Sequence, residues 1–196
     1  MCELHETISE LLYNFLRSER GRQLCTSCVV HRPIWADDLP TGSDQSESVP
    51  NDKFDSLMLT STFCLVVPGV TPFRLKFIHA ILAGCLPVVV EFPSYLPGFS
   101  SWWKPRGAPH IFNVPFPDQT NYSAFVVGVP WRDAHDFPEH CLQKLLGMEK
   151  EDIHDRQVAM QKIRDFVMYD WSGSRPDAFT ALLDRIVDIV DGVAVF

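Results

Sequence analysis

The sequence lacks any long apolar run and any excess of basic side chains. No stretch approaches the roughly 18 to 20 consecutive apolar residues that a membrane-spanning helix needs. There are 17 Lys and Arg against 25 Asp and Glu, which gives a formal net charge of −8. Nucleic-acid binding needs a basic face, so this balance argues against nucleic acid as a partner. Residues 1–20 are acidic and amphipathic, which does not match a secretory signal peptide.

Motifs for hydrolysis and metal binding are also scarce. The sequence has no G-x-S-x-G, and its seven His are scattered, so Ser-His-Asp catalysis has no support. One CxxC occurs at Cys25 and Cys28, with His31 three residues further on. Zinc needs four ligands in a tetrahedral array, so a lone CxxC does not predict a metal site. Cysteines under a short N-terminal subdomain are the favoured interpretation, and we expect no metal.

The composition suits one ordinary globular domain. The 196 residues are 46% hydrophobic and 21% charged, which is enough for a full hydrophobic core. Residues 1–35 hold an apolar stripe at helical spacing and then the short cysteine segment. Residues 36–53 are dominated by Pro, Gly, Ser, Asp and Glu, which predicts an exposed, mobile loop. Residues 54–196 are expected to form the main domain with a helical C-terminal tail.

Two short apolar runs predict the centre of the fold. Phe63–Val67 and Leu86–Val90 have the length and composition of strands buried on both faces. The segment between them opens with Thr-Pro, which is typical of a helix start, and closes at Gly84, which is typical of a helix end. We therefore expect two neighbouring parallel strands, joined by a helix over residues 72–83.

Cys64 and Cys85 both belong to this strand–helix–strand unit, one on the first strand and one at the start of the second. A disulfide between them is one interpretation. Buried free thiols are commoner at such apolar positions and are the favoured expectation.

The rest of the chain is less regular. Prolines and aromatic rings alternate through residues 93–117, and Trp102 and Trp103 can either stack on a sugar face or pack over the core. Packing is favoured for any one ring. A third strand is expected at Phe125–Val129. Helices are expected at residues 54–59, 139–146 and 149–168, and from Pro176 onward.

The turn after the first strand is a candidate phosphate site. In α/β folds, a strand that ends at a Gly turn and leads into a capped helix presents free N–H groups and a helix dipole that favour negative charge. Gly69, Val70 and Thr71 occupy this turn and are candidate ligands of a pyrophosphate. A tight turn with no ligand remains the alternative, because the motif is shorter than a P-loop or dinucleotide fingerprint.

The same stretch resembles the signature of the exostosin family of glycosyltransferases (glycosyltransferase family 47 type). The shared elements, in order, are FCL at 63–65, Gly69, Thr71-Pro72, Ala80-Ile81 and GCLPV at 84–88. Asn121 to Phe125 resembles the family's next landmark. The resemblance covers about residues 60–130.

The resemblance implies both a fold and a function. It implies a Rossmann-like parallel sheet with flanking helices, similar to the C-terminal, donor-binding half of a GT-B glycosyltransferase. The activity implied is transfer from a nucleotide sugar to a glycan or glycoprotein, with no cofactor beyond that donor. A missing N-terminal domain or a partner glycosyltransferase is implied as well, together with the Golgi or another lumen of the secretory pathway.

Departures from the family pattern fall at the implied donor site. Lys76 stands where the family has Arg, and His79 stands where it has an acidic residue. Lys keeps the positive charge for a phosphate but loses the planar fork of Arg. His can hydrogen-bond one ribose hydroxyl, whereas a carboxylate can accept from two. Val67 and Pro68 also replace the family's Pro and usual Arg.

The catalytic residues are not identified by the sequence. Glu91, at the end of a predicted strand, and Asp118 are the best local carboxylates for a general base. Glu91 can equally be a rim charge. Two other hypotheses stay open: a non-catalytic exostosin relative that acts as a scaffold or binds a glycan, and an unrelated small α/β nucleotide-binding protein.

Overall fold

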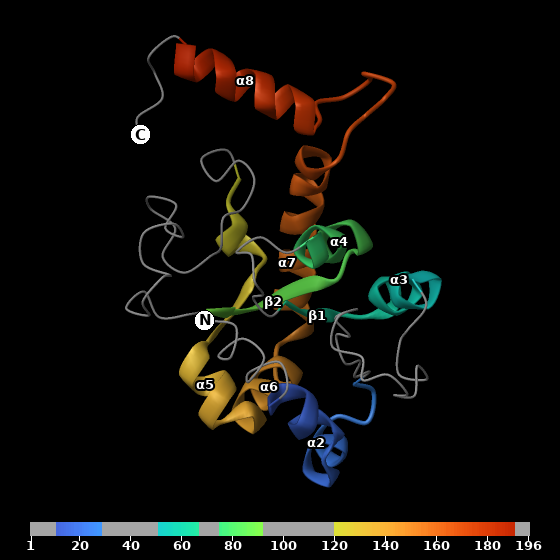
Figure 1. Cartoon of the computed structure of the whole chain (residues 1–196), viewed down its shortest axis with the longest axis vertical. Coiled ribbons are helices and arrows are strands. Elements are labelled where there is room, and N and C mark those ends of the chain that lie inside the picture. The colour runs from blue at the N-terminus through green and yellow to red at the C-terminus, as the bar shows by residue number, and fades with distance from the viewer. Residues whose placement is uncertain (1–10, 29–50, 67–74, 92–119, 191–196) are drawn as a thin grey trace, which may run out of the picture.

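The computed structural model describes residues 11–28, 51–66, 75–91 and 120–190 (Figure 1). In these residues three strands form one sheet in the order β1-β2-β3. β1 spans Phe63–Val66, β2 spans Leu86–Glu91 and β3 spans Val127–Pro130. Helices lie on both faces of the sheet, so the predicted α/β class is confirmed.

Both strand pairs are parallel. Cys64 of β1 lies opposite Pro87 of β2, and Val89 of β2 lies opposite Gly128 of β3. The prediction of two neighbouring parallel strands is confirmed, and β2 runs one residue further than expected. The third strand begins at Val127, two residues later than predicted, because a short 3-10 turn, η2 (Tyr122–Ala124), comes before it.

One face of the sheet packs against α4 (Leu75–Ala83) and α7 (Lys150–Arg164). Val66 of β1 and Val89 of β2 meet Phe77 and Ile81 of α4 in a single apolar cluster. The buried residues of this cluster are Val66, Phe77, Ile81, Leu86, Val89, Tyr122, Phe125, Val126, Met160 and Ile163. The inward face of α4 is thus apolar.

The other face packs against α5 (Trp131–Asp136), α6 (Pro138–Leu146) and the helical residues 11–17. Val88 and Val90 of β2 contribute to this second cluster, together with Leu12 and Ala134. Successive valines of β2 therefore pack on opposite faces of the sheet, as expected for a strand that is buried on both faces. In Figure 1, α5, α6 and α2 lie below the strands, and α8 lies at the opposite end of the molecule.

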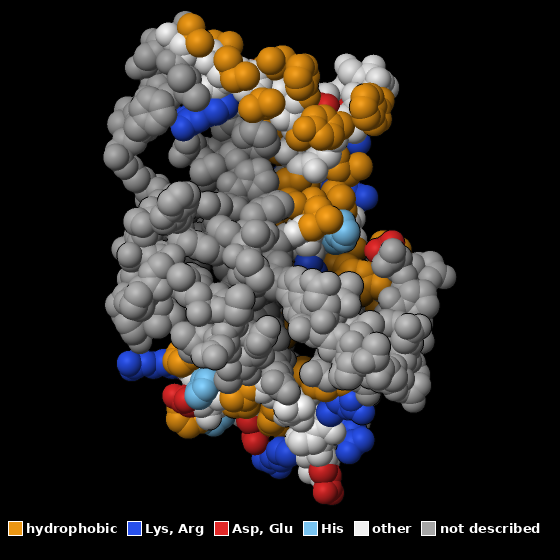
Figure 2. Space-filling model, viewed as in Figure 1, with side chains coloured by type: hydrophobic (Ala, Val, Ile, Leu, Met, Phe, Trp, Pro, Cys, Tyr) orange, Lys and Arg blue, Asp and Glu red, His pale blue; other side chains and the backbone are white. Residues whose placement is uncertain are grey.

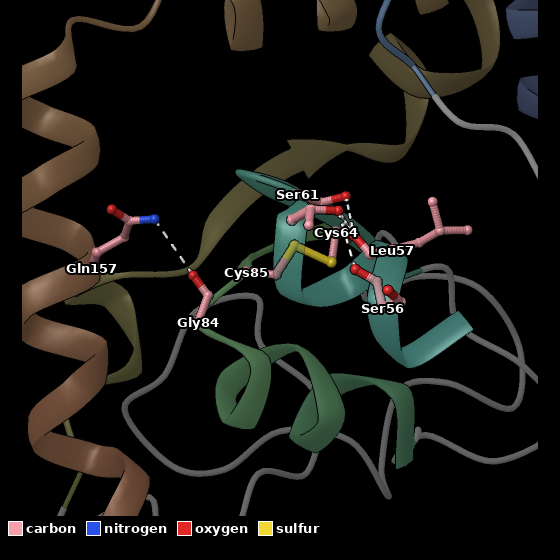
Figure 3. Close-up of a disulfide and its surroundings, with 8 residues drawn as sticks. Ser56, Leu57, Ser61, Cys64, Gly84, Cys85 and Gln157 are labelled. Carbon is pink, nitrogen blue, oxygen red and sulfur yellow. Dashed lines mark hydrogen bonds between the residues drawn. A yellow bond between two sulfur atoms is a disulfide. The ribbon is translucent and has the colours of Figure 1, made fainter. Parts of the chain in front are cut away.

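Gly84 ends α4 as predicted. Its φ is +79°, a left-handed conformation that glycine adopts without the steric cost of a Cβ. The Cys85 amide donates to the Ala80 carbonyl at 3.0 Å, and Gln157 of α7 donates to the Gly84 carbonyl at 3.4 Å (Figure 3). The predicted start of this helix, at residues 72–74, lies outside the described residues.

The expectation of free thiols at Cys64 and Cys85 is wrong. Their sulfur atoms form a disulfide, with Cα atoms 5.7 Å apart (Figure 3). The parallel register explains the pairing, since it places Cys64 opposite Pro87, two residues from Cys85 and on the same side of the strand. Met58 of α3 (Asn51–Thr60) and Ala80 of α4 cover the bridge. The bridge is buried, since Cys64 is 7% exposed and Cys85 is 0% exposed.

The N-terminal region contains one more helix than expected. The helix through residues 11–17 stops at a bend, and α2 (Glu19–Leu24) follows, with the Ser18 hydroxyl accepting from the Gly21 amide. Arg20 therefore lies on α2. Its guanidinium donates to both carboxylate oxygens of Glu139 on α6, at 2.5 and 3.1 Å. This ion pair connects segments that are 119 residues apart in the sequence.

The cysteines of the CxxC segment are also paired. Cys25 and Cys28 form a second disulfide directly after α2. Of the expected mobile loop, residues 36–50 lie outside the described residues, and residues 51–53 belong to α3.

A polar loop fixes the start of α8 (Ala178–Val190). Asp177 is 8% exposed and accepts hydrogen bonds from the amides of Asp170 and Thr180, at 2.8 and 2.9 Å. These bonds lower the pKa of Asp177. The last helix thus begins with a side-chain cap one residue after the predicted Pro176.

The outer face of α8 is apolar and exposed (Figure 2). Its exposed apolar side chains are Phe179, Leu182, Leu183, Ile186, Val187 and Val190. Trp171, in the loop before the helix, is 97% exposed.

The buried disulfide should contribute more to stability than the CxxC disulfide. We expect Cys64→Ala/Cys85→Ala to lower the free energy of unfolding by about 3 kcal/mol, since the bridge closes a loop of more than 20 residues. The matched control, Cys25→Ala/Cys28→Ala, removes a four-residue loop and should cost about 2 kcal/mol. Denaturant unfolding of the oxidised proteins measures both. An unchanged unfolding midpoint in the first variant would contradict this expectation.

The Arg20–Glu139 pair should make stability depend on pH. The hydrogen bond from Arg20 lowers the pKa of Glu139, so its contribution is complete above the unfolded pKa of about 4.3 and is lost as pH falls through the folded pKa. Glu139→Gln should therefore be less stable than the wild type at pH 7, and the difference should disappear in acid. Thermal unfolding from pH 7 to pH 3 tests this, with Glu149→Gln as the control. A difference that stays constant with pH would refute the ionic role.

Candidate functional site

The carboxyl edge of the sheet is the candidate functional site. In open α/β sheets, ligands bind outside the carboxyl ends of parallel strands. β1 leads from this edge towards α4, β2 ends here at Glu91, and β3 continues directly into α5. Glu91 lies in register with Pro130, so the ends of β2 and β3 are adjacent.

Lys76 is the first predicted donor residue that the structure places. It lies in the first turn of α4, with its side chain exposed, while Phe77 and Ile81 point into the core. Its Nζ lies 5.7 Å from the ring centroid of Phe54 on α3. This is a cation–π contact, worth about 0.5–1 kcal/mol at an exposed site. The ammonium is thus held by a ring beside the start of α4.

His79 lies three residues further along the same helix and is partly buried. Residues three apart are neighbours on a helix surface, so Lys76 and His79 share one side of α4. A cation and an imidazole on one side of a helix can contact a phosphate and a hydroxyl of a single ligand.

The other predicted residues are placed in part or lie outside the described residues. Glu91 is the last residue of β2, at the carboxyl edge, as expected for a candidate base. Gly69, Val70 and Thr71 lie outside the described residues, as does Asp118. Trp102 and Trp103 also lie outside them.

Three side chains on α5, which the sequence did not predict as site residues, form a group: Trp131, His135 and Asp136. Trp131 is the first residue after β3, and its ring stacks on the His135 ring with centroids 4.9 Å apart. His135 Nδ1 lies 2.6 Å from Asp136 Oδ1. A carboxylate that holds one imidazole nitrogen leaves the other available for proton transfer or hydrogen bonding. The signal available in the sequence was the position of Trp131, two residues after the end of the third predicted strand.

The described residues contain no group of three or more His, Cys, Asp or Glu arranged to hold a metal ion. Within the same residues, none of the helices has the length and apolar character needed to cross a membrane.

A parallel sheet with helices on both faces and candidate ligand residues at its carboxyl edge defines this chain as an α/β protein. Comparison with protein families then identifies the group. The family model described as Exostosin GT47 domain matches residues 16–145, which are 130 of the 196 residues. The chain belongs to the exostosin GT47 family. The resemblance noted over residues 60–130 is therefore confirmed and extends in both directions.

Curated relatives agree with this assignment. The chain is 25% identical over 142 residues to a probable xyloglucan galactosyltransferase GT19 of Arabidopsis thaliana, covering 69% of this chain and 29% of that protein. It is 27% identical over 136 residues to a probable xyloglucan galactosyltransferase GT13 of the same plant, covering 66% and 26%. It is 26% identical over 123 residues to an exostosin-1 homolog of Caenorhabditis elegans, covering 59% and 28%. The chain spans less than a third of the length of these relatives.

Proposed function

We propose that this chain is the donor-binding part of a glycosyltransferase. It corresponds to the C-terminal, Rossmann-like half of a GT-B enzyme and binds a nucleotide sugar whose sugar is transferred to a glycan or glycoprotein. The observation that carries the proposal is the family match, which covers all three strands and α4. The parallel sheet supports it, because its carboxyl edge is where such folds bind phosphorylated ligands.

In this proposal the diphosphate lies at Gly69, Val70 and Thr71, before α4. Lys76 reaches the phosphates from the first turn of the helix, and His79 hydrogen-bonds a ribose hydroxyl. The contact of Lys76 with Phe54 supports this role, because it places the ammonium beside the start of the helix. A charge-assisted hydrogen bond to phosphate is worth about 1.5–3 kcal/mol, more than the roughly 0.5–1 kcal/mol of an exposed cation–π contact.

For the catalytic base we name three candidate side chains and do not choose among them. Glu91 and Asp118 remain the candidate carboxylates. The contact of His135 Nδ1 with Asp136 Oδ1 makes His135 a third candidate, because it orients the imidazole ring and leaves the other ring nitrogen to contact an acceptor hydroxyl.

We also propose that the chain works in the lumen of the secretory pathway, in the Golgi for example. The two disulfides support this location, because disulfides form and persist in oxidising compartments. A further N-terminal domain or a partner glycosyltransferase supplies the acceptor side. The length of the curated relatives, more than three times the matched part, supports this.

A non-catalytic relative that binds a glycan or scaffolds another transferase is the second candidate. The observations that favour it are the replacements at Lys76 and His79, which weaken the donor contacts of the family pattern. Titration of nucleoside diphosphates against the purified chain separates the two. Saturation at micromolar concentration supports donor binding, and no binding up to millimolar concentration supports the second candidate.

Removal of the Lys76 ammonium should weaken nucleoside diphosphate binding. We expect Lys76→Ala to raise Kd about tenfold or more, since each charge-assisted bond to phosphate is worth at least about 1.5 kcal/mol. Lys144→Ala, on the exposed surface of α6, is the matched control and should leave Kd unchanged. Isothermal titration calorimetry measures both. Equal affinities for the wild type and Lys76→Ala would move the site away from α4.

His79→Glu tests the ribose contact in the same assay. A carboxylate accepts from two adjacent hydroxyls, so this variant should bind a nucleoside diphosphate more tightly than the wild type. The corresponding 2′,3′-dideoxy diphosphate should bind both proteins equally. The ribose contact would be refuted if His79→Glu bound both ligands more tightly than the wild type. It would also be refuted if His79→Glu bound the nucleoside diphosphate more weakly than the wild type.

The chain assayed by itself should not transfer sugar to an acceptor. Transfer requires donor and acceptor in near-attack contact with water excluded. Among the described residues the helices before β1 pack around one three-stranded sheet and do not build an opposing α/β wall. Slow donor hydrolysis is the most we expect. Acceptor-dependent release of nucleoside diphosphate measures this, and robust turnover by residues 1–196 without a partner would overturn it.

A further inference from the structure

Asn121, Tyr122 and Ser123 form an Asn-x-Ser sequence. It is the only Asn-x-Ser or Asn-x-Thr in the 196 residues, and its middle residue is not proline. This pattern is the acceptor sequence for N-linked glycosylation and is used when the asparagine lies on the surface of a protein in the secretory pathway. The side chains of Asn121 and Ser123 have no role in the core packing described above or in the proposed donor site.

The fold presents the acceptor side chains by burying the residue between them. Tyr122 is 4% exposed, and its ring lies 5.9 Å from Phe77 and 5.6 Å from Phe125, measured between centroids. This burial raises the pKa of the Tyr122 phenol. Asn121 and Ser123, on either side, are both exposed. The anchored tyrosine therefore fixes the turn with its acceptor residues in solvent.

The two acceptor side chains are also linked to each other. The Ser123 hydroxyl donates a hydrogen bond to Asn121 Oδ1 at 2.6 Å. Among the described residues, no hydrogen bond uses the Asn121 amide nitrogen. The nitrogen that would carry a sugar thus makes no hydrogen bond within the described part of the chain.

We propose that Asn121 carries an N-linked glycan when the chain folds in the secretory lumen, an inference that rests on the proposed location. The donor is a lipid-diphosphate-linked oligosaccharide. A bond forms between Asn121 Nδ2 and the anomeric carbon of the first sugar. The bond from that carbon to the diphosphate oxygen breaks, the lipid diphosphate leaves with the electron pair, and the amide nitrogen loses one proton.

The position is compatible with donor binding. The turn η2 precedes β3, so Asn121 lies towards the amino edge of the sheet, and the candidate donor site lies at the carboxyl edge. The four residues of β3 separate the two edges by about 13 Å. A glycan on Asn121 therefore extends from the end of the sheet opposite the donor site.

The test is expression of the full chain behind a cleavable secretory leader in eukaryotic cells. We expect the secreted protein to migrate more slowly in gel electrophoresis, and peptide-N-glycosidase to abolish the shift. The enzyme converts a glycosylated Asn to Asp, so mass spectrometry of the treated protein should find Asp at position 121. A secreted, folded chain with unmodified Asn121 would overturn the proposal.

Matched variants identify the site. Asn121→Gln and Ser123→Ala should lose the shift, and Ser123→Thr should keep it because threonine supplies the same hydroxyl. Ser172→Ala, in another exposed loop, should migrate like the wild type. Both acceptor side chains are exposed, so circular dichroism should show the wild-type fold in every variant. A shift that persists in Asn121→Gln would also overturn the proposal.

The glycan readout is independent of donor binding. Nucleoside diphosphate titration of the unglycosylated chain tests the proposed function by itself. A failure there overturns donor binding and leaves the gel shift unchanged, whereas a missing shift overturns the glycan and leaves the titration unchanged.

Discussion

Burial of β2 on both faces is the constraint on which the rest of the structure depends. Val88, Val89 and Val90 are each no more than 1% exposed, so this strand has no polar face to offer to solvent. Helices must therefore cover both sides of the sheet, as α4 and α7 do on one side and α5 and α6 on the other. Parallel pairing then requires a crossover between consecutive strands, and it collects all the carboxyl ends at one edge. The candidate site exists because of this arrangement.

The central unit could be predicted because its signals are local. An apolar run, a helix-length segment and Gly84 are each visible in a few consecutive residues, and the positive φ of Gly84 gives the physical reason for the helix end. The third strand was predicted two residues early. Phe125 looks like a strand residue by composition, but its ring belongs to the Tyr122 cluster on one face and its backbone closes the 3-10 turn.

The missed features depend on contacts between distant segments. The disulfide of Cys64 requires the parallel register, which composition does not reveal. The helix α5 has only six residues, too few for a helical period to show, and burial of Ala134 against the sheet stabilises it. The candidate site could also be predicted only where its signals are local. Helical spacing alone puts Lys76 and His79 on one side of α4. The contact of Lys76 with Phe54 and the stack of Trp131 on His135 follow only from the packing of helices.

The amino edge of the sheet is anchored by a disulfide and a buried aromatic ring, whereas the carboxyl edge carries the candidate site. At the amino edge, the Cys64–Cys85 bridge joins β1 to the start of β2, and the buried Tyr122 fixes the turn before β3. At the carboxyl edge, β2 ends at Glu91, and β3 leads directly into α5, which carries Trp131 and His135. A ligand site needs side chains that can reach a ligand, and Lys76 has an exposed side chain whose Nζ lies beside the Phe54 ring. The disulfide and the buried Tyr122 hold the amino edge without using any of these polar side chains, so anchoring and the candidate site lie at opposite ends of the strands.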